Sequence, residues 1–440
     1  MTQLMTDTSY LQRLLPAGSA PSTLGPGWLQ VRREEARQQW LRAGLPTKTD
    51  EQWRFTDLSP LAETVFSTAS AAAATTAAPI SDGRLSGLDG DELVLVNGKL
   101  NGTAARWPSA PVRVTLLSQA VAAELKTFET LLGAQARPTH HGLIALNTAN
   151  FGDVVLVEVP PGVAVDRPLN LIVHSAGDQP FITHPRILLK IGANSSATVV
   201  LTFTGSDNLT YLTNSVLETY VGAGSRVELV KIQREGSAAL HIGSDYAHLE
   251  KDVRFQSLSL NHGGLLVRNN ATVTLAGPGG EATLNGLSMT AGQQHVDNHT
   301  MLDHAREHCA SHELYKSLLA GRSSGTFTGK ILVRPGSQKT DAKQTSKAVL
   351  LSSQASMNSQ PQLEIYADDV KCTHGSTNGP LDEEQLFYLR ARGLAYNQAR
   401  AMLTSAFAAD VMARVWLPAL RTALEDSVVT ELHRLEREEL

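Results

Sequence analysis

Residues 186–205 read RILLKIGANSSATVVLTFTG, two short runs rich in aliphatic residues on either side of a polar segment. Each run has the length and composition of a β-strand, and the Gly-Ala-Asn-Ser-Ser segment between them is typical of a turn. The same texture recurs from about residue 90 to 370, as in 153–177 (DVVLVEVPPGVAVDRPLNLIVHSAG) and 225–236 (SRVELVKIQREG). Because a single sandwich of that length would be unusually large, this pattern favours a β-solenoid.

The strands of this body are expected to have two distinct faces, since side chains alternate between the two sides of a strand. In 225–236, Val227 and Leu229 would share one side, and Glu228 and Val230 the other. Alternation of this kind supports strands rather than helices for the body.

The first 80 residues have a helical pattern and end in a linker. Apolar residues recur at roughly helical spacing before a stop signal formed by Gly44 and Pro46. These apolar residues are Trp28, Val31, Ala36 and Trp40. Segment 67–83, STASAAAATTAAPISDG, has few large apolar residues and is interpreted as a linker or a weak helix. We therefore assign a helical region and linker to 1–80 and the β core to 81–378.

The remaining residues, 379–440, predict a C-terminal helical domain. Asp382 is placed to cap a first helix, with Gln385 completing a capping box, and Gly393 is placed to end it. A second helix would carry an apolar stripe, and Pro418 marks the start of a third. The stripe consists of Ala399, Leu403, Ala406, Phe407 and Val411. The predicted order is helices, a long β body and helices again.

Composition narrows the class of protein. The 440-residue chain is 42% hydrophobic and 18% charged, as is typical of a globular protein. Its formal charge of −5 lacks the basic excess expected of a nucleic-acid-binding protein. The start lacks the layout of a signal peptide, and two cysteines cannot form a disulfide framework. We expect a cytoplasmic protein, and one that cannot alone supply the usual four thiolates of an iron–sulfur cluster.

The stretch 321–333, GRSSGTFTGKILV, superficially resembles a phosphate-binding loop. That motif requires a glycine five residues before Gly329, where Ser324 stands. It also requires Ser or Thr after Lys330, where Ile331 stands. We therefore expect this chain to bind no nucleotide, so any ATP used in its work would be hydrolysed by another subunit.

Residues 295–316, HVDNHTMLDHAREHCASHELYK, contain five histidines and Cys309. On a helix, His304, His308 and His312 would share one face and could hold zinc. On a strand they would lie about 13 Å apart at each step, too far to share a metal ion. Because the segment lies in the β body and lacks the glutamate of the HExxH motif, a zinc site is the less favoured interpretation.

Residues 370–375, VKCTHG, contain the second cysteine, Cys372, followed by His374. They could be a buried cysteine beside a hydrogen-bonded histidine, half of a metal site, or a nucleophile with its base. On a strand the two side chains would share a face with Cβ atoms about 6.5–7 Å apart. That spacing is awkward for direct proton transfer and suitable for two metal ligands. A free cysteine is most often simply buried, so all three interpretations stay open.

Four ordered segments carry a resemblance to one known family. They are 44–61 (GLPTKTDEQWRFTDLSPL), 146–177 (LNTANFGDVVLVEVPPGVAVDRPLNLIVHSAG), 362–379 (QLEIYADDVKCTHGSTNG) and 381–394 (LDEEQLFYLRARGL). Together they resemble the SufB/SufD family of the SUF iron–sulfur cluster assembly system, over roughly residues 40–415. The resemblance is to the SufD branch, because SufB-like chains usually carry additional cysteines.

This resemblance implies a right-handed parallel β-helix core flanked by N-terminal and C-terminal helical regions. It implies a non-catalytic scaffold subunit that pairs through its β-helix with a SufB-like subunit, binds a SufC-like ATPase and assists iron acquisition. A transient iron ion or iron–sulfur cluster would be shared with the partner chain. The isolated chain could also form a homodimer.

The resemblance also assigns roles to individual residues. The family motif KCxHG maps onto 371–375, which makes His374 a candidate iron ligand at the partner interface and Cys372 a candidate second ligand. The candidate ATPase-docking residues are Phe387, Tyr388, Arg390, Arg392 and Phe407, the last of which also suits packing between helices.

Two other functions remain open at this point. One is a β-helix lyase or esterase acting on carbohydrate, for which Asp368 and Asp369 form an adjacent acidic pair beside the Cys–His stretch. The other is a purely structural adaptor in which His374 is a core residue.

Overall fold

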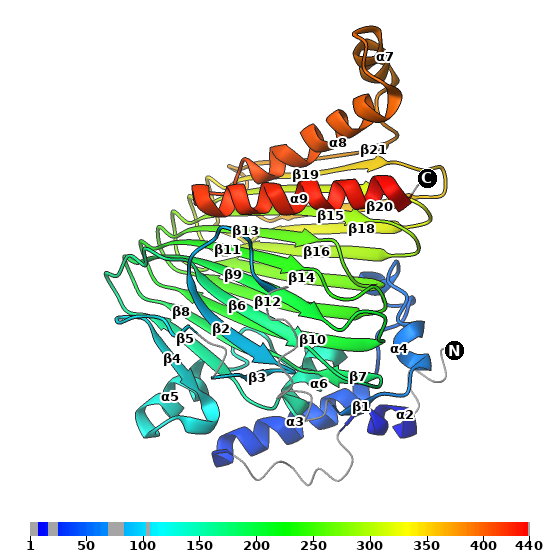
Figure 1. Cartoon of the computed structure of the whole chain (residues 1–440). Helices are drawn as coiled ribbons and strands as arrows, with labels where there is room; N and C mark the ends of the chain where they lie inside the picture. Colours follow the sequence, from blue (N-terminus) through cyan, green and yellow to red (C-terminus); the bar gives the residue numbers. More distant parts are fainter. Residues whose placement is uncertain (1–7, 16–24, 69–82, 103–105, 439–440) are drawn as a thin grey trace.

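The body of the protein is a parallel β-helix with helical regions at both ends of the chain (Figure 1). The computed structural model describes residues 8–15, 25–68, 83–102 and 106–438, so most of the linker predicted at 67–83 lies outside them. Consecutive strands of the body alternate between two sheets, and each strand pairs in parallel with the strand of the next coil in the same sheet. The β-solenoid favoured by the sequence pattern is confirmed.

Each sheet is a stack of strands, one from each coil. The first sheet contains β5 (Val155–Val159), β8 (Arg186–Ile191), β10 (Tyr211–Val221), β12 (Leu240–Leu249), β14 (Leu266–Leu275), β16 (His295–His304), β18 (Ser324–Val333) and β20 (Ser356–Ile365). The second contains β2 (Asp91–Val96), β6 (Leu169–Ser175), β9 (Ser196–Gly205), β11 (Arg226–Gln233), β13 (Arg254–Asn261), β15 (Glu281–Thr290), β17 (Ala310–Leu319), β19 (Asp341–Leu350) and β21 (Lys371–Gly379). Short strands at the margins of the two sheets are β1 (Ser67–Thr68), β3 (Lys99–Leu100), β4 (Arg113–Leu116) and β7 (Phe181–Thr183).

The alternation read from 225–236 gives the inside and the outside of the coils. Val227 and Leu229 lie in the apolar core inside the β-helix. Val230 lies on the outer face, in the apolar cluster beneath the C-terminal helices. The Glu228 carboxylate also faces outward, where it accepts hydrogen bonds from the backbone N–H groups of Trp416 (2.6 Å) and Leu417 (3.2 Å). The sequence prediction for both faces is confirmed.

One side of the coil stack turns at residues with a left-handed backbone. They are Gly162, Asn194, Gly224, Asp252, Gly279, His308 and Lys339. Each of these turns also bonds to its neighbour: the N–H of Asn194 donates to the carbonyl of Ala223 at 2.8 Å, and that of His308 to the carbonyl of Gln338 at 2.9 Å. His308 therefore lies in a turn between β16 and β17, so the helical arrangement of the histidines considered for a zinc site is excluded.

We expect His308→Val to lower the free energy of unfolding by about 1–2 kcal/mol, because a β-branched residue is strained at a positive φ. His308 has a φ of 58° and an exposed side chain, so few contacts change with the substitution. Urea denaturation is the measurement. His308→Gly is the control and should be at least as stable as wild type, whereas equal loss in both variants would show that the side chain itself matters.

The N-terminal helices pack on the outer face of the first sheet. They are α2 (Thr8–Arg13), α3 (Gly27–Ala43), α4 (Ser59–Glu63), α5 (Ala122–Leu131) and α6 (Gly142–Asn150). Trp40 of α3 and Leu143 of α6 share an apolar cluster with Leu212 and Leu240 of the sheet. The predicted stripe on α3 is partly wrong, because Leu29 is buried and Val31 is exposed.

Helices α5 and α6 lie within the stretch that the sequence pattern assigned to strands. Helix α5 has ten residues and α6 has nine, each shorter than the segments in which helical periodicity is clear. The two helices separate β4 from β5, so the uninterrupted coils begin after residue 150.

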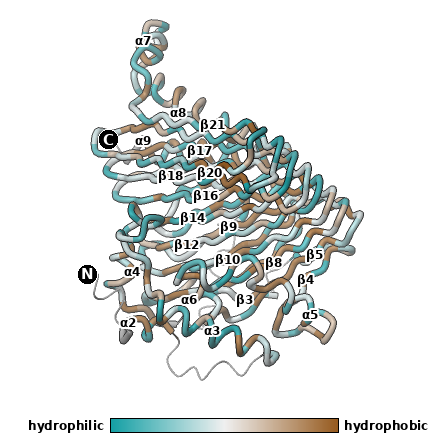
Figure 2. Tube along the Cα trace, turned by 180° about the vertical axis from the view of Figure 1, so that it is seen from behind, coloured by the Kyte–Doolittle hydropathy of each residue, from teal (hydrophilic) through white to brown (hydrophobic). Residues whose placement is uncertain are grey.

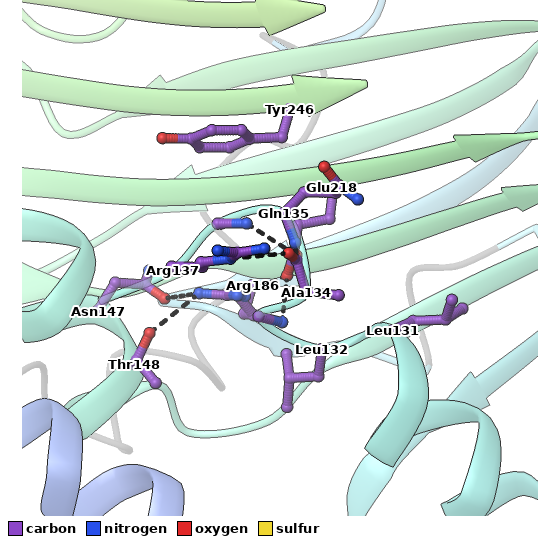
Figure 3. A network of polar contacts seen from close by, with 12 residues as sticks. Leu131, Leu132, Ala134, Gln135, Arg137, Asn147, Thr148, Arg186, Glu218 and Tyr246 are labelled. Atoms are coloured by element: carbon purple, nitrogen blue, oxygen red, sulfur yellow. Dashed lines mark hydrogen bonds and ion pairs between the residues drawn. The ribbon is translucent and has the colours of Figure 1, made fainter. Parts of the chain in front are cut away.

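A buried ion pair between two strands of the first sheet also bonds to this helical region (Figure 3). Arg186 of β8 and Glu218 of β10 are both fully buried, with Nη2 and Oε1 2.5 Å apart. Glu218 also accepts hydrogen bonds from the backbone N–H groups of Gly133, Gln135 and Ala136 at 2.8–3.0 Å. This carboxylate therefore fixes the segment between α5 and α6 to the β-helix.

The aromatic segment DEQWRFTD (50–57) is also fixed to the outer face. The guanidinium of Arg268 lies 3.8 Å from the ring centre of Trp53 and 2.5 Å from Asp297 Oδ2. Thr56 donates a hydrogen bond to the same Asp297 carboxylate. These buried contacts give the segment a structural role.

Three helices follow the β-helix, and the last two of them cover the second sheet. The three are α7 (Glu383–Ala391), α8 (Tyr396–Met412) and α9 (Pro418–Glu438). Buried apolar residues of α8 and α9 pack on outward-facing leucines such as Leu258, Leu287 and Leu314. The start of α9 at Pro418 is confirmed, whereas the predicted stripe on α8 is partly wrong because Ala406 is exposed.

The predicted ends of α7 are close to those observed. Asp382 caps the helix by accepting hydrogen bonds from the N–H groups of Glu384 (2.9 Å) and Gln385 (3.2 Å), and Gly393 follows the helix with a φ of 97°. The capping box is wrong in one detail, since the Gln385 side chain donates to the Asp382 carboxylate instead of accepting from the Asp382 backbone N–H. Within the described ranges, no helix is long and apolar enough to cross a membrane.

Candidate functional site at the open end of the β-helix

The segment VKCTHG lies at the end of the coil stack. Among the described strands, β21 is the last of the second sheet and pairs with β19 alone, and β20 is the last of the first sheet and pairs with β18 alone. Both strands are much more exposed than those inside the stack: β10 is almost wholly buried, whereas no described residue of β20 or β21 is. The last coil therefore presents two strand edges and an uncovered interior.

Cys372 points into this coil. It is half-buried and packs against the apolar interior, as do Val370, Met357 and Leu363. Burial and the nearby Asp341 carboxylate raise the pKa of the Cys372 thiol above its ordinary value. Because the thiolate is the reactive and metal-binding form, Cys372 is not activated as a nucleophile in the free chain.

His374 follows two residues later on β21, so its side chain lies on the same face as that of Cys372. Unlike Cys372 it is exposed, because no further coil covers it. Among the described contacts no hydrogen bond joins Cys372 to His374, which leaves the nucleophile–base interpretation without support. His374 is therefore not a core residue, whereas the adaptor interpretation assumed that it is one.

Described residues of this chain cannot form a complete metal site. Nowhere in the described ranges do three or more His, Cys, Asp or Glu side chains cluster so that they could hold a metal ion. An exposed imidazole beside a half-buried thiol suits a borderline or soft metal such as iron, but supplies only two ligands. Iron bound at this end would therefore need ligands from another chain or from solvent.

The histidine-rich stretch does not supply those ligands. His304 is buried, with Nε2 2.8 Å from Ser311 Oγ, and burial lowers its pKa to about 4. His299 faces the opposite side of β16, and burial likewise lowers its pKa to about 4. His308 and His312 are exposed, in a turn and on β17 respectively. These histidines are spread over both faces of the coil, which agrees with the low weight given to a zinc site.

The structure also shows where two other candidate sites predicted from the sequence lie, the phosphate-loop-like segment and the acidic pair. The segment that resembled a phosphate loop is strand β18, with Gly329 inside the coil. Asp368 and Asp369 are exposed residues before β21, and the Asp369 carboxylate pairs with Lys339 of the neighbouring turn. Residues 324–333 therefore form a strand and not the loop that the phosphate-binding motif requires.

Helix α7 stands away from the β-helix beside its open end (Figure 2). Phe387 is 73% exposed and Tyr388 is 57% exposed, and Leu386 is the buried residue of this helix. Arg392 donates a hydrogen bond to the Tyr388 hydroxyl at 3.0 Å and lies over its ring. Arg390 is also exposed and lies 5.9 Å from the ring centre of Tyr396. Four of the predicted docking residues therefore form an aromatic and basic surface.

Phe407 has a different position from the other four. Its ring lies 4.4 Å from Lys316 Nζ of β17, and its backbone carbonyl accepts a hydrogen bond from the same group at 2.8 Å. Lys316 also pairs with Asp410 at 2.8 Å. These contacts attach α8 to the second sheet, which is the packing alternative given for Phe407.

A buried polar row that leads to His374 was missed from the sequence. Glu313 of β17, Gln344 of β19 and His374 of β21 are register partners in successive coils. Gln344 Nε2 donates to Glu313 Oε2 at 2.7 Å, and burial raises the pKa of Glu313 to about 7. Strand alternation in the sequence could have predicted that each of these residues faces the inside of the coil. It could not have predicted that the three lie side by side in successive coils.

These features define a class of parallel β-helix protein with an open terminal coil and a projecting helix, α7. Two family models match the chain: "SUF system FeS cluster assembly, SufBD core domain" over residues 172–407 and "SufBD protein N-terminal region" over residues 25–171. The chain therefore belongs to the SufB/SufD family of iron–sulfur cluster assembly proteins.

Relatives with curated names are similar over most of their length. An iron–sulfur cluster assembly SufBD family protein of Synechocystis sp. is 30% identical over 395 residues, 87% of each chain. The iron–sulfur cluster assembly protein SufD of Escherichia coli is 29% identical over 385 residues, 85% of this chain and 86% of the relative. A SufBD family protein of Mycobacterium leprae is 28% identical over 396 residues, 88% of this chain and 91% of the relative.

Proposed function

We propose that this chain is a non-catalytic scaffold subunit of an iron–sulfur cluster assembly complex. It pairs through the open end of its β-helix with a SufB-like subunit, binds a SufC-like ATPase through its C-terminal helices and assists iron acquisition. The observation that carries this proposal is the last coil, where β20 and β21 have free edges and His374 is exposed.

The free edges support pairing with a homologous subunit. An unpaired strand edge presents a row of N–H and C=O groups and is a ready template for another strand. Soluble proteins usually protect such edges with charge, bulges or a covering element. Here β21 contains Cys372, Thr373, Ser376 and Thr377, with a single charged residue at its start, so little opposes docking of another β-helix end.

Iron enters the proposal as cargo held between chains. His374 would supply one ligand, Cys372 a second after loss of its proton, and the partner the others. Binding a metal ion would favour the Cys372 thiolate, since a coordinated thiol is deprotonated. The two ligands do not complete a metal site without those of the partner, so the site would form only in the assembled complex.

Co-purification tests the assembly part of this proposal. The chain is co-expressed with the SufB-like and SufC-like proteins of the same genome, with a tag on this chain only. Recovery of all three in one complex is the expected result. A chain that elutes alone, or as a homodimer that excludes both proteins, would contradict the proposal.

We expect His374→Ala to lower the iron bound by the purified complex at least about tenfold, because even second-shell changes cost 10–100-fold in metal affinity. Iron content is measured on complexes reconstituted under anaerobic conditions. His312→Ala, which removes another exposed histidine from β17, is the matched control and should bind iron as wild type does. Unchanged iron content in His374→Ala would leave a structural adaptor as the better description.

A further inference from the structure

The buried row behind His374 ends in an acceptor without a donor. Gln344 is 1% exposed, and its Oε1 atom is buried without a hydrogen-bond partner among the described residues. An unpartnered buried carbonyl oxygen costs free energy, and such atoms in native proteins call for an explanation. The neighbour on one side, Glu313, is already bonded to the other end of the same amide, Nε2, at 2.7 Å.

The orientation of this amide is fixed by its surroundings. Nε2 is the donor to the Glu313 carboxylate, so Oε1 is left as the free end of the group. The amide also lies against Gly329, where a Cβ atom would be only 1.8 Å from Gln344 Nε2. Any other residue at position 329 would place its Cβ atom in the space that the Gln344 amide occupies. The glycine therefore allows the coil to hold the Gln344 side chain in place.

His374 is the side chain that follows in the row. Gln344 and His374 are register partners in β19 and β21, and neighbouring strands lie about 4.8 Å apart. Both residues face the inside of the coil, and their strands, β19 and β21, are direct neighbours in the sheet. In the structure the oxygen is unpartnered, so the His374 side chain must turn towards it for a ring nitrogen to donate.

We infer that Gln344 is a positioning residue for His374, whose ring N–H donates to Gln344 Oε1. This leaves the second ring nitrogen without a proton and turned towards the open end, where it can bind a divalent metal ion. Ligand histidines commonly donate their other N–H to a carbonyl or carboxylate, which fixes both tautomer and ring orientation. The inference deepens the proposed function, because it rests on His374 as a metal ligand.

The test uses the full-length chain with ring-¹⁵N-labelled histidine and Zn²⁺ as a diamagnetic probe. Nitrogen shifts give the tautomer of His374, assigned by the signal lost in His374→Ala, and calorimetry gives Zn²⁺ affinity. The variants are Gln344→Met, which removes the amide at similar volume, and Gln344→Asn, which shortens it. Ser346→Ala is the matched control, since Ser346 is also inward-facing and buried on β19 but is the register partner of Ser376.

In the wild type and in Ser346→Ala, one tautomer of His374 should dominate. In both Gln344 variants the second tautomer should appear and the Zn²⁺ affinity that depends on His374 should fall about tenfold. Far-ultraviolet circular dichroism establishes that each variant is folded, and Gln344→Asn serves if Gln344→Met is not. Wild-type tautomer ratio and affinity in a folded Gln344 variant would overturn the inference. If His374→Ala binds Zn²⁺ as wild type does, the metal-ligand role fails instead, and the tautomer comparison still decides the role of Gln344.

Discussion

Glu218→Ala is expected to lower the free energy of unfolding by about 3–5 kcal/mol, because it leaves the buried Arg186 guanidinium without its counter-charge. The same substitution removes the acceptor for three backbone N–H groups between α5 and α6. Neither loss can be relieved by solvent, since both charged side chains are fully buried. Chemical denaturation measures the global effect, and amide hydrogen exchange over 131–150 measures the release of the helical segment.

Glu281→Ala is the matched control for Glu218→Ala. Glu281 is also a strand glutamate with an arginine partner, Arg254, but both side chains are more than half exposed and the charged atoms are 3.5 Å apart. Exposed pairs of this kind contribute about 0–1 kcal/mol. Equal destabilisation by the two substitutions, or unchanged exchange over 131–150 in Glu218→Ala, would refute the assigned role of the buried pair.

The β-helix could be predicted from the sequence because its signals are local. Runs such as 186–205 show strand composition and a turn within twenty residues, and inward and outward positions follow from alternation alone, as in Val227 and Val230. Helices α5 and α6 were missed because short helices carry little periodicity. The segment between them is bonded to Glu218, which lies 82–85 positions away in the sequence.

The candidate site, like the fold, could be predicted from the sequence only in its local features. The strand position of Cys372 and His374 and their shared face follow from a few neighbouring residues. The row of Glu313, Gln344 and His374 does not, because it depends on the register between coils about 30 residues apart, which no short motif specifies. The exposure of His374 depends on something else again, namely that no coil follows β21. Sequence reasoning therefore found the residues, and the stacking of coils gave them their surroundings.

The second large effect concerns α7. We expect Phe387→Ala and Tyr388→Ala each to weaken binding of the SufC-like ATPase by about 2 kcal/mol, roughly 30-fold, if these exposed aromatic residues fill pockets at the centre of the interface. Both side chains are mostly exposed in the free chain, so their loss should leave the stability of this protein almost unchanged. Calorimetric titration of the ATPase into the tagged chain measures the affinity.

Trp107→Ala is the control for these substitutions, because Trp107 is a half-exposed aromatic residue outside the C-terminal helices. It should bind the ATPase as wild type does. Phe407→Ala should behave differently from all three, since Phe407 covers Lys316 and its loss loosens α8 on the second sheet. That variant should be less stable as well as weaker in binding. Wild-type affinity in both α7 variants would place the ATPase elsewhere on the molecule, and would separate the projecting helix from the function proposed for it.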